Sequence, residues 1–357
     1  MRWIGFSLVL VACASTNNNG NNTNTAGTSG STGATGTSGS IGQTGETGAS
    51  GPAVTGHFYY TYDNQVFRIA AASGATPENI STLLDNNVGA SADNERRINA
   101  SVNGEWMTLE ASRFGCTSCL VRINKAANAG EAIKPDGNDL FLEGLVAISA
   151  SGDVVVYATS GGTHSLDLYK TTRSGAGVWG SPVLLTGASS YDYNNMPSLS
   201  FDGQTIAFDC GANRDPESGD NDACSVNING GAVTRLVGTT PNPSGVMTPP
   251  RNTYVQNPHF GLDGLLFEGS WPFDGKMPET IWLLPTGATT PTPIGRNIDN
   301  AVAPCTLRDG RFGALWLGRT GNASGAHELT VLNRDGTNPV TLTPNLDVVD
   351  AGVGCSD

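Results

Sequence analysis

The feature that most constrains the fold is a short segment that recurs about every fifty residues after residue 57. In its clearest copy, PSLSFDGQTIAF at 197–208, a small polar strand leads into an Asp-Gly turn and then into an apolar strand. Asp-Gly between two such runs predicts a hairpin with a type I′ turn, in which both central residues have positive φ. Related segments occur at 99–109, 146–158, 257–269 and 303–316, and their turn glycines are 46 to 61 residues apart. One period therefore holds about four short strands, which is typical of a propeller blade.

Each copy continues with a second pair of strands. Apolar runs that follow one another at this point are 168–172 with 182–186, 225–231 with 234–237, and 328–336 with 340–343. The order P-x-x-S-x-D-G, two apolar strands, D-G and x-x-L-T resembles the TolB-type propeller repeat, and the resemblance covers nearly all of residues 57–357. It implies an all-β, six-bladed β-propeller. TolB also carries an additional N-terminal domain and is not a lipoprotein, so the resemblance does not imply a role in the TolB system.

The two ends of this region predict how the ring closes. HFYYTY at 57–62 and QVFRIAA at 65–71 look like the second and third strands of a blade that lacks its first. The chain ends at 352–357, where a first strand would reach its turn. An aspartate also stands ten residues before the turn position in four units, at Asp93, Asp192, Asp299 and Asp347. We expect the C-terminal strand to complete the first blade, which leaves no exposed central edge.

The N-terminus reads as a targeting signal. Arg2 precedes an apolar run from Trp3 to Val11, which is too short to span a bilayer as a helix. Leu10-Val11-Ala12-Cys13 resembles the bacterial lipobox, which implies that residues 1–12 are a lipoprotein signal peptide and that Cys13 is lipidated. The alternative is ordinary secretion with an incidental cysteine. We expect a protein of the cell envelope that is anchored in the outer membrane by lipid, on its periplasmic or surface face.

Residues 13–56 are expected to form a disordered linker. After Cys13 the segment contains one charged residue, Glu46, and no aromatic residue, so it cannot bury enough surface to offset its ordering entropy. Glycine recurs at every third position from 27 to 51, which resembles collagen-like stalks. The intervening positions are Thr, Ser and Ala with almost no proline, so a flexible Gly/Ser/Thr linker is favoured and a trimeric stalk is the alternative.

Six cysteines remain for the propeller, an even number that fits an oxidising compartment. A Cys210–Cys224 bridge would clamp the loop between two strands, and a Cys305–Cys355 bridge would lock the ring closed. Cys116 and Cys119 form a Cys-x-x-Cys that could instead be redox-active or half of a zinc site. The thioredoxin-like context and a second Cys/His pair are absent from the sequence, so structural disulfides are favoured, with connectivity open.

The charge balance excludes nucleic acid as a partner. The chain has 32 acidic and 19 basic residues and a net charge of -13, without the basic patch that phosphate neutralisation needs. One loop, 211–223, concentrates carboxylates at Asp215, Glu217, Asp220 and Asp222. Such oxygens could collect Ca²⁺, although the EF-hand spacing is absent, and the alternative is a solvated acidic loop. No other cofactor is expected.

The aspartates of the ten-residue spacing are candidates for ligand binding. If the fold is a propeller, Asp93, Asp192, Asp299 and Asp347 lie on loops that ring one mouth of the central channel, where they would attract a cation or a basic peptide segment. His259, in a first strand near the channel, joins this candidate set. The structural alternatives are Asx turns for the aspartates and a satisfied or solvent-facing imidazole for His259.

Catalytic motifs are largely missing from the sequence. There is no Gly-x-Ser-x-Gly elbow, and no second histidine follows His327-Glu328 at zinc-protease spacing. We therefore predict a binding or scaffold protein whose propeller face recognises an envelope protein or a cell-wall component. The alternatives are a lyase or hydrolase that acts on an envelope polymer from the channel, and a trimeric stalked surface protein.

Overall fold

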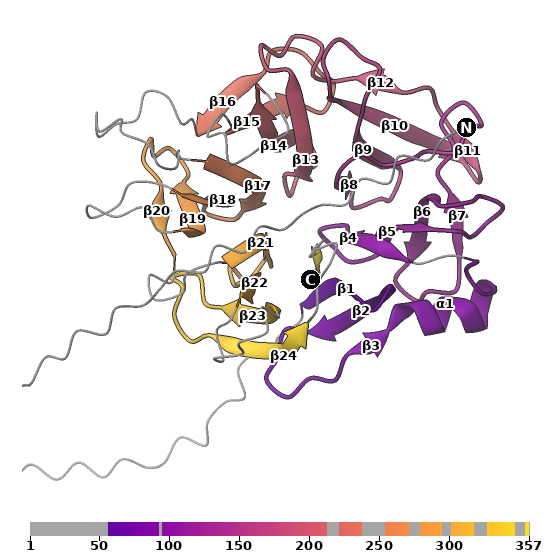
Figure 1. The fold of residues 1–357 in the computed structure, drawn as a ribbon, viewed down its shortest axis with the longest axis horizontal. Coiled ribbons are helices and arrows are strands. Elements are labelled where there is room, and N and C mark those ends of the chain that lie inside the picture. The colour runs from indigo at the N-terminus through magenta and orange to yellow at the C-terminus, as the bar shows by residue number, and fades with distance from the viewer. Residues whose placement is uncertain are drawn as a thin grey trace, which may run out of the picture. The chain divides into compact units, whose positions relative to one another are not determined.

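The computed structural model describes residues 56–92, 95–212, 221–237, 254–270, 279–294, 301–317, 327–346 and 354–356. Within these ranges the strands form six antiparallel sheets arranged around a centre, one for each blade (Figure 1). The all-β, six-bladed propeller predicted from the repeat is therefore confirmed. The predicted signal peptide, Cys13 and the Gly/Ser/Thr linker lie outside the described residues, apart from Gly56.

The blades are numbered from the N-terminus, and the strands of each are given from the centre outwards. Blade 1 contains β25 (Gly354–Ser356), β1 (His57–Tyr62), β2 (Gln65–Ala70) and β3 (Glu78–Asn79). Blade 2 contains β4 (Arg96–Ala100), β5 (Trp106–Ala111), β6 (Cys119–Asn124) and β7 (Gly130–Ala132). Blade 3 contains β8 (Val146–Ile148), β9 (Val154–Thr159) and β10 (Asp167–Gly175), and β10 pairs with both β11 (Val178–Trp179) and β12 (Val183–Leu184). Blade 4 contains β13 (Tyr193–Leu199), β14 (Thr205–Gly211), β15 (Asp222–Asn227) and β16 (Thr234–Val237). Blade 5 contains β17 (Tyr254–Gly261), β18 (Gly264–Ser270), β19 (Glu279–Pro285) and β20 (Thr292–Pro293). Blade 6 contains β21 (Ala301–Thr306), β22 (Phe312–Leu317), β23 (His327–Leu332) and β24 (Val340–Leu346).

The C-terminal strand completes the first blade, as the sequence predicts. β25 pairs antiparallel with β1, with Phe58 opposite Cys355. The hydroxyls of Tyr59 and Ser356 lie 3.1 Å apart in a buried hydrogen bond. A disulfide between Cys305 and Cys355 then links the innermost strand of blade 6 to that of blade 1. The ring is thus closed by backbone pairing and by one covalent bond.

The recurring segment forms the turn between the first two strands of a blade, and its Ser-x-Asp-Gly form occurs in blade 4. In blade 4 the hydroxyl of Ser200 donates to Asp202 (2.6 Å) and accepts the N–H of Thr205 (3.0 Å). The N–H of Gly203 donates to the carbonyl of Ser200, and Gly203 has a φ of +68°. Only the glycine has positive φ, so the predicted type I′ turn is wrong at this position. The side-chain bonds of Ser200 stabilise a longer turn that ends in a left-handed glycine.

A two-residue turn with two positive φ values does occur in blade 1, where the sequence contains no glycine. Asp63 and Asn64 have φ values of +49° and +58°, and Tyr62 pairs directly with Gln65. Aspartate and asparagine tolerate this region better than other non-glycine residues because their short polar side chains can bond locally.

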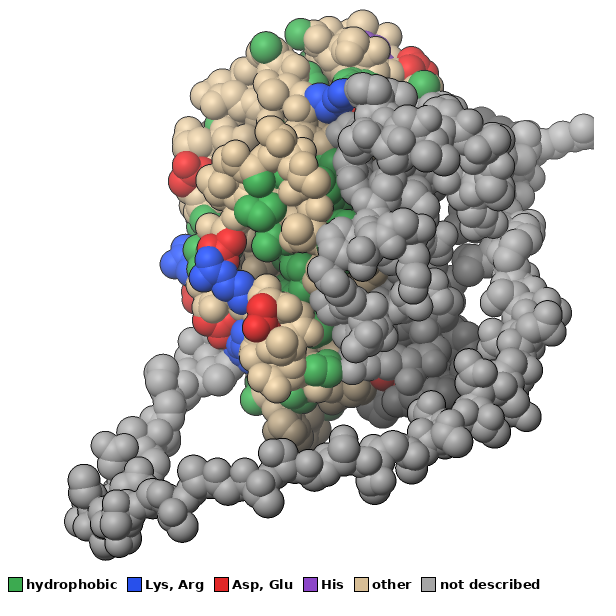
Figure 2. All heavy atoms as spheres, turned by 90° about the vertical axis from the view of Figure 1, so that its left-hand side faces the viewer, with side chains coloured by type: hydrophobic (Ala, Val, Ile, Leu, Met, Phe, Trp, Pro, Cys, Tyr) green, Lys and Arg blue, Asp and Glu red, His purple; other side chains and the backbone are tan. Residues whose placement is uncertain are grey.

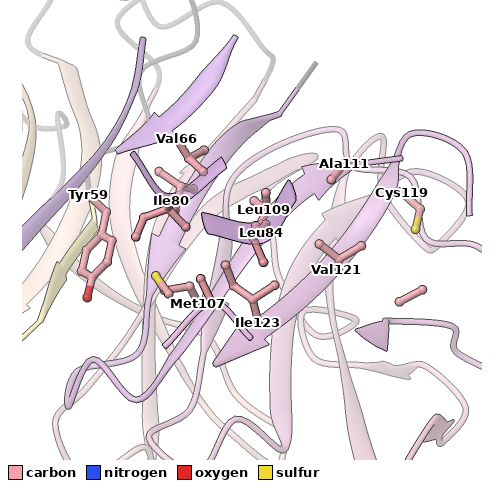
Figure 3. Close-up of a cluster of buried hydrophobic side chains, with 13 residues drawn as sticks. Tyr59, Val66, Ile80, Leu84, Met107, Leu109, Ala111, Cys119, Val121 and Ile123 are labelled. Carbon is pink, nitrogen blue, oxygen red and sulfur yellow. The ribbon is translucent and has the colours of Figure 1, made fainter. Parts of the chain in front are cut away.

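Apolar side chains fill the spaces between neighbouring blades. Strand alternation turns Met107 and Leu109 of β5 toward blade 1, where they pack with Tyr59 and Val66 in a cluster that is almost fully buried (Figure 3). Further clusters of this kind occupy the other interfaces between blades. Burial between blades rather than within one sheet holds the ring together.

The one helix among the described residues, α1 (Ile80–Val88), was not predicted. It follows β3 on the outside of blade 1, and its residues Ile80 and Leu84 are buried against the core between blades 1 and 2. Asn79 caps it by accepting the N–H of Thr82 (2.8 Å). Across the described ranges, no helix is long and apolar enough to cross a membrane.

Candidate ligand-binding cavity

A central cavity of about 450 Å³ lies beside the turns between the first two strands of blades 2, 3 and 4. Every blade contributes at least one residue to its lining. From blade 1 to blade 6, one contributor each is Cys355, Asn99, Ser149, Ser200, His259 and Thr306. The turns of blades 3 and 4 supply most of the remaining wall, together with Lys170 and Asn229. A ligand held there would contact the whole ring.

The lining consists mainly of hydroxyls, amides and small apolar side chains. The charged residues among its lining residues are Lys170 and Asp202, of opposite sign. The ammonium group of Lys170 donates to the amide oxygen of Asn229 (3.1 Å). Hydrogen bonds from the Ser200 hydroxyl and the Gln204 N–H lower the pKa of Asp202. The cavity is therefore polar and close to neutral, although the whole chain carries a charge of -13.

His259 lies in this cavity, on the innermost strand of blade 5. Its Nδ1 is 3.2 Å from the carbonyl oxygen of Phe260. Burial lowers the pKa of His259 to about 4, so the imidazole is uncharged at neutral pH. An uncharged imidazole can donate and accept hydrogen bonds to a ligand. The part of the prediction that places His259 near the channel agrees with the structure, and its role in binding stays a prediction.

Asp192 does not share the cavity with His259. It precedes β13, whereas the cavity is lined by the other end of that strand, from Ser198 onward. Its Oδ1 accepts the N–H of Ser165 (3.1 Å), and its carbonyl accepts the Ser165 hydroxyl (2.6 Å). These bonds join blade 4 to the preceding blade, which is a structural role but not the Asx turn considered as the alternative. Asp93, Asp299 and Asp347 lie outside the described residues, so the predicted ring of aspartates stays a prediction.

All six cysteines of the propeller are paired. The disulfides are Cys116–Cys119, Cys210–Cys224 and Cys305–Cys355, which gives the connectivity that the sequence leaves open. The Cys-x-x-Cys lies at the link between β5 and β6, and the part of the chain that the structure describes contains no cluster of three or more His, Cys, Asp or Glu side chains that could hold a metal. Three disulfides are typical of proteins in an oxidising, extracytoplasmic compartment.

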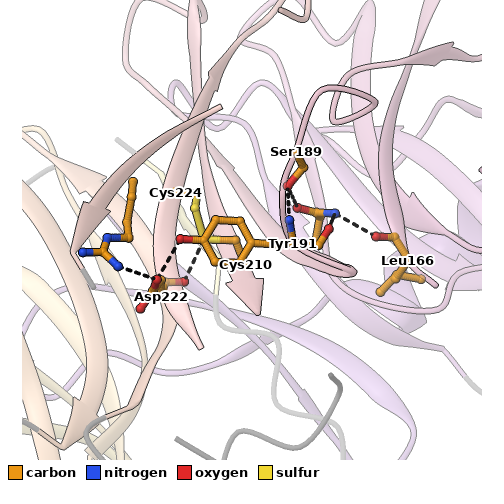
Figure 4. Close-up of a disulfide and its surroundings, with 8 residues drawn as sticks. Leu166, Ser189, Tyr191, Cys210, Asp222 and Cys224 are labelled. Carbon is orange, nitrogen blue, oxygen red and sulfur yellow. Dashed lines mark hydrogen bonds and ion pairs between the residues drawn. A yellow bond between two sulfur atoms is a disulfide. The ribbon is translucent and has the colours of Figure 1, made fainter. Parts of the chain in front are cut away.

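Of the four acidic residues proposed for Ca²⁺ in the loop 211–223, only Asp222 is described. It begins β15 and is buried, with its Oδ2 accepting the hydroxyl of Tyr191 (2.8 Å), close to the Cys210–Cys224 disulfide (Figure 4). Arg235 approaches the same oxygen at 3.5 Å. These contacts give Asp222 a structural role in blade 4. Asp215, Glu217 and Asp220 lie outside the described residues, so their binding of Ca²⁺ stays a prediction.

Charged side chains are few on the side of the described surface that Figure 2 shows. Uncharged side chains and backbone cover most of it, and hydrophobic side chains are scattered. Most of the Lys/Arg and Asp/Glu side chains in view lie in one mixed group near the left edge, and a few others are separate, near the top and the upper left (Figure 2). Mixed charges of this kind neutralise one another locally, as in the pair of Arg68 with Glu78. The described surface in this view therefore shows no single-sign patch that would select a polyelectrolyte.

Sequence reasoning missed most of the cavity residues. Ser149, Ser151, Ser200 and Asn229 fall within segments that the sequence predicts as strands and turns, without a role in binding, whereas the structure brings them to one cavity. The signal was present in the repeat itself. Equivalent turns of a propeller converge around its axis, so the serines that recur at the turns of blades 3 and 4, Ser149 and Ser200, are placed both to stabilise their turns and to line the cavity.

Comparison with known proteins gives similarity at the level of fold. No family model matches the chain, and no curated protein matches it. TolB of Acinetobacter baumannii is similar with a TM-score of 0.58 at 13% identity, over 86% of this chain and 68% of that one. A TolB structure from Agrobacterium tumefaciens has a TM-score of 0.52 at 14% identity, over 81% and 88% of the two chains. Hydrazine synthase of Kuenenia stuttgartiensis has a TM-score of 0.50 at 10% identity, over 84% and 48%. The fold is thus shared with TolB and with an enzyme.

Proposed function

We propose that this protein is a lipid-anchored binding protein of the cell envelope. Its Cys13 is the anchor, its linker sets the reach, and the propeller face that carries the turns between the first two strands of the blades recognises an envelope protein or a cell-wall component. The observation that carries the proposal is the central cavity, because all six blades contribute to it and its wall offers hydroxyl, amide and imidazole groups. Such a site is suited to recognition through hydrogen bonds.

The same lining favours binding over catalysis. General acid–base chemistry needs a positioned pair of titratable groups whose pKa values suit their roles. In the cavity the imidazole of His259 contacts a backbone carbonyl, and Lys170 is held by an amide. The channel lyase or hydrolase considered from the sequence is therefore the weaker candidate.

In-cell photo-crosslinking tests the proposed face. A photoreactive residue replaces Asn229 in the cavity, or, as the control, Val178, which is exposed on the outer strand β11. We expect crosslinks to one envelope component from Asn229 only. Equal crosslinking from the two positions would contradict a specific binding face.

Metabolic labelling with a palmitate analogue tests the anchor. The full chain should incorporate label and a Cys13→Ser variant should not, because the thiol of Cys13 is the proposed acylation site. An unlabelled full chain would remove the anchor from the proposal and leave the propeller face untouched.

A further inference from the structure

The interface between blades 4 and 5 contains a carboxylate without a partner. Asp209, on β14, is fully buried, and neither of its side-chain oxygens makes a hydrogen bond. Burial and the nearby carboxylate of Glu268 raise the pKa of Asp209 well above its ordinary value. A buried polar group without a partner is costly, so this carboxylate calls for an explanation.

The backbone brings a second carboxylate to the same place. The innermost strand of blade 5 has a bulge between Gln256 and His259, where Asn257 has a φ of +46°. Asn257 thereby lies between the two acids, because its backbone N–H faces Asp209 without completing a hydrogen bond to either carboxylate oxygen, and its side chain hydrogen-bonds Glu268. Glu268 is also buried, and it accepts the N–H of Ala303 (2.5 Å) from the next blade.

Further amide oxygens at this interface also lack partners. The Oδ1 of Asn257 is buried and unbonded, and so are both polar side-chain atoms of Asn221, a residue that is fully buried. Asn221 belongs to the same interface because its carbonyl accepts the N–H of Val255 from blade 5 (3.2 Å). Four side chains therefore supply two carboxylates and two amides to one buried region, with several oxygens unused.

This set of atoms has the chemistry of a hard cation site. Carboxylate and amide oxygens are the preferred ligands of Ca²⁺, which accepts six to eight of them in flexible geometry. Mg²⁺ demands near-ideal octahedral geometry and retains several waters, which suits a closed interface poorly. A divalent cation would also neutralise two carboxylates that otherwise repel each other in a buried setting.

We propose that Asp209, Asn221, Asn257 and Glu268 form a Ca²⁺ site between blades 4 and 5. This site differs from the acidic loop that the sequence suggested, and it does not depend on what binds the central cavity. The ion would link strands of two blades and so stabilise the ring, as a bound ligand stabilises the folded state that binds it.

Calorimetric titration and thermal unfolding of the EDTA-treated protein test the site. We expect CaCl₂ to bind one ion per chain and to raise the melting temperature saturably, with a much smaller response to MgCl₂. Asp209→Asn, which preserves shape, should weaken Ca²⁺ binding at least about tenfold because the amide removes one negative charge. Asp63→Asn is the matched control, since it makes the same change on the exposed turn of blade 1, away from the cavity, and it should bind Ca²⁺ as the parent does.

A second variant and three further results complete the test of the Ca²⁺ site. Glu268→Gln provides a second variant if Asp209→Asn folds poorly, as judged by circular dichroism in EDTA. Absence of saturable Ca²⁺ binding to the parent would overturn the site, and preference for Mg²⁺ would overturn the choice of ion. A double variant Glu217→Gln/Asp220→Asn that loses the response, while Asp209→Asn keeps it, would assign the ion to the acidic loop instead.

Discussion

Blades 1 and 4 have the same four-strand pattern but are assembled differently. In blade 4 the strands follow one another along the chain from Tyr193 to Val237, and its disulfide joins neighbouring strands 14 residues apart. Blade 1 takes its innermost strand from the C-terminus, and the disulfide beside it bridges to blade 6 over 50 residues. A blade built from local hairpins can form early, whereas the closing blade pays the entropy of bringing distant segments together.

The difference suggests where the ring is most vulnerable. β25 has three residues and pairs with β1 over that length only. Its strand is nevertheless buried, and Cys355 packs into the core between blades 6 and 1. A short strand that caps a large interface depends on its covalent and side-chain contacts more than a strand held in a hairpin does.

Truncation of the chain after residue 353 should have the largest effect. It removes β25, the Tyr59–Ser356 hydrogen bond and the Cys305–Cys355 disulfide, and exposes the inner edge of β1. We expect a loss of more than about 4 kcal/mol in the free energy of unfolding, since loss of the disulfide alone is of this order. Urea unfolding followed by tryptophan fluorescence measures it, and an unchanged midpoint would refute closure by the C-terminal strand.

Removing the disulfides one at a time should give a graded series. The chain-entropy model predicts that the free energy of unfolding falls by about 4 kcal/mol without Cys305–Cys355, about 3 kcal/mol without Cys210–Cys224 and about 2 kcal/mol without Cys116–Cys119. The sequence separations are 50 for Cys305–Cys355, 14 for Cys210–Cys224 and 3 for Cys116–Cys119. Paired Cys→Ser variants, compared in urea without reductant, provide the measurement. Equal losses for the first two pairs would show that closing blade 1 carries no extra cost.

The sequence predicted the repeat architecture because turn and strand signals are local. Ser200, Asp202 and Gly203 specify a turn by their own bonds, and the serine bonds recur in blades 2 and 3 at Ser101 and Ser149. Even closure could be inferred, because an incomplete blade at one end requires a strand from the other. The short helix α1 escaped prediction since its nine residues are stabilised by Ile80 and Leu84 in the core rather than by helical propensity.

The candidate sites were harder to predict because they depend on which blades face each other. Asp209 and Glu268 occupy the same position in the second strands of blades 4 and 5, yet only the bulge at Asn257 shows that both meet one residue. Bulges in the innermost strands leave no clear mark in the sequence: their left-handed residues are Arg97, Met196, Asn257 and Ala303. Cavity-lining residues were likewise hidden among ordinary turn residues.

Two glycine substitutions compare the closing interface with blade 4, and we expect them to destabilise the protein less than loss of the long disulfide does. A Cβ at Gly313 in blade 6 would come within 2.4 Å of the Phe58 ring of blade 1, whereas nothing lies within 4 Å of one at Gly203 in blade 4. Gly313→Ala should cost about 1–3 kcal/mol by overpacking the closing interface. Gly203→Ala should cost about 1–2 kcal/mol through its positive φ alone.

A second change separates these two mechanisms. Phe58→Leu makes room beside Gly313, so it should reduce the penalty of Gly313→Ala in a double-mutant cycle and leave that of Gly203→Ala unchanged. Thermal unfolding of the four combinations supplies the coupling energy. Additive effects at positions 58 and 313 would show that the closing interface is not tightly packed there.

The smallest expected effect concerns α1, the helix that, among the described residues, only blade 1 carries. Asn79→Ala removes the cap that accepts the N–H of Thr82, so it should destabilise the protein by about 1 kcal/mol. Thr82→Ala is the matched control, because it retains the backbone N–H and therefore the capping bond. Hydrogen exchange of the α1 amides locates the effect: faster exchange should appear in Asn79→Ala and not in Thr82→Ala. If both variants exchange as the parent does, the packing of Ile80 and Leu84 alone holds α1 in place. The helix of blade 1 would then be stabilised in the same way as the sheets of the other blades, by apolar contact with the neighbouring blade.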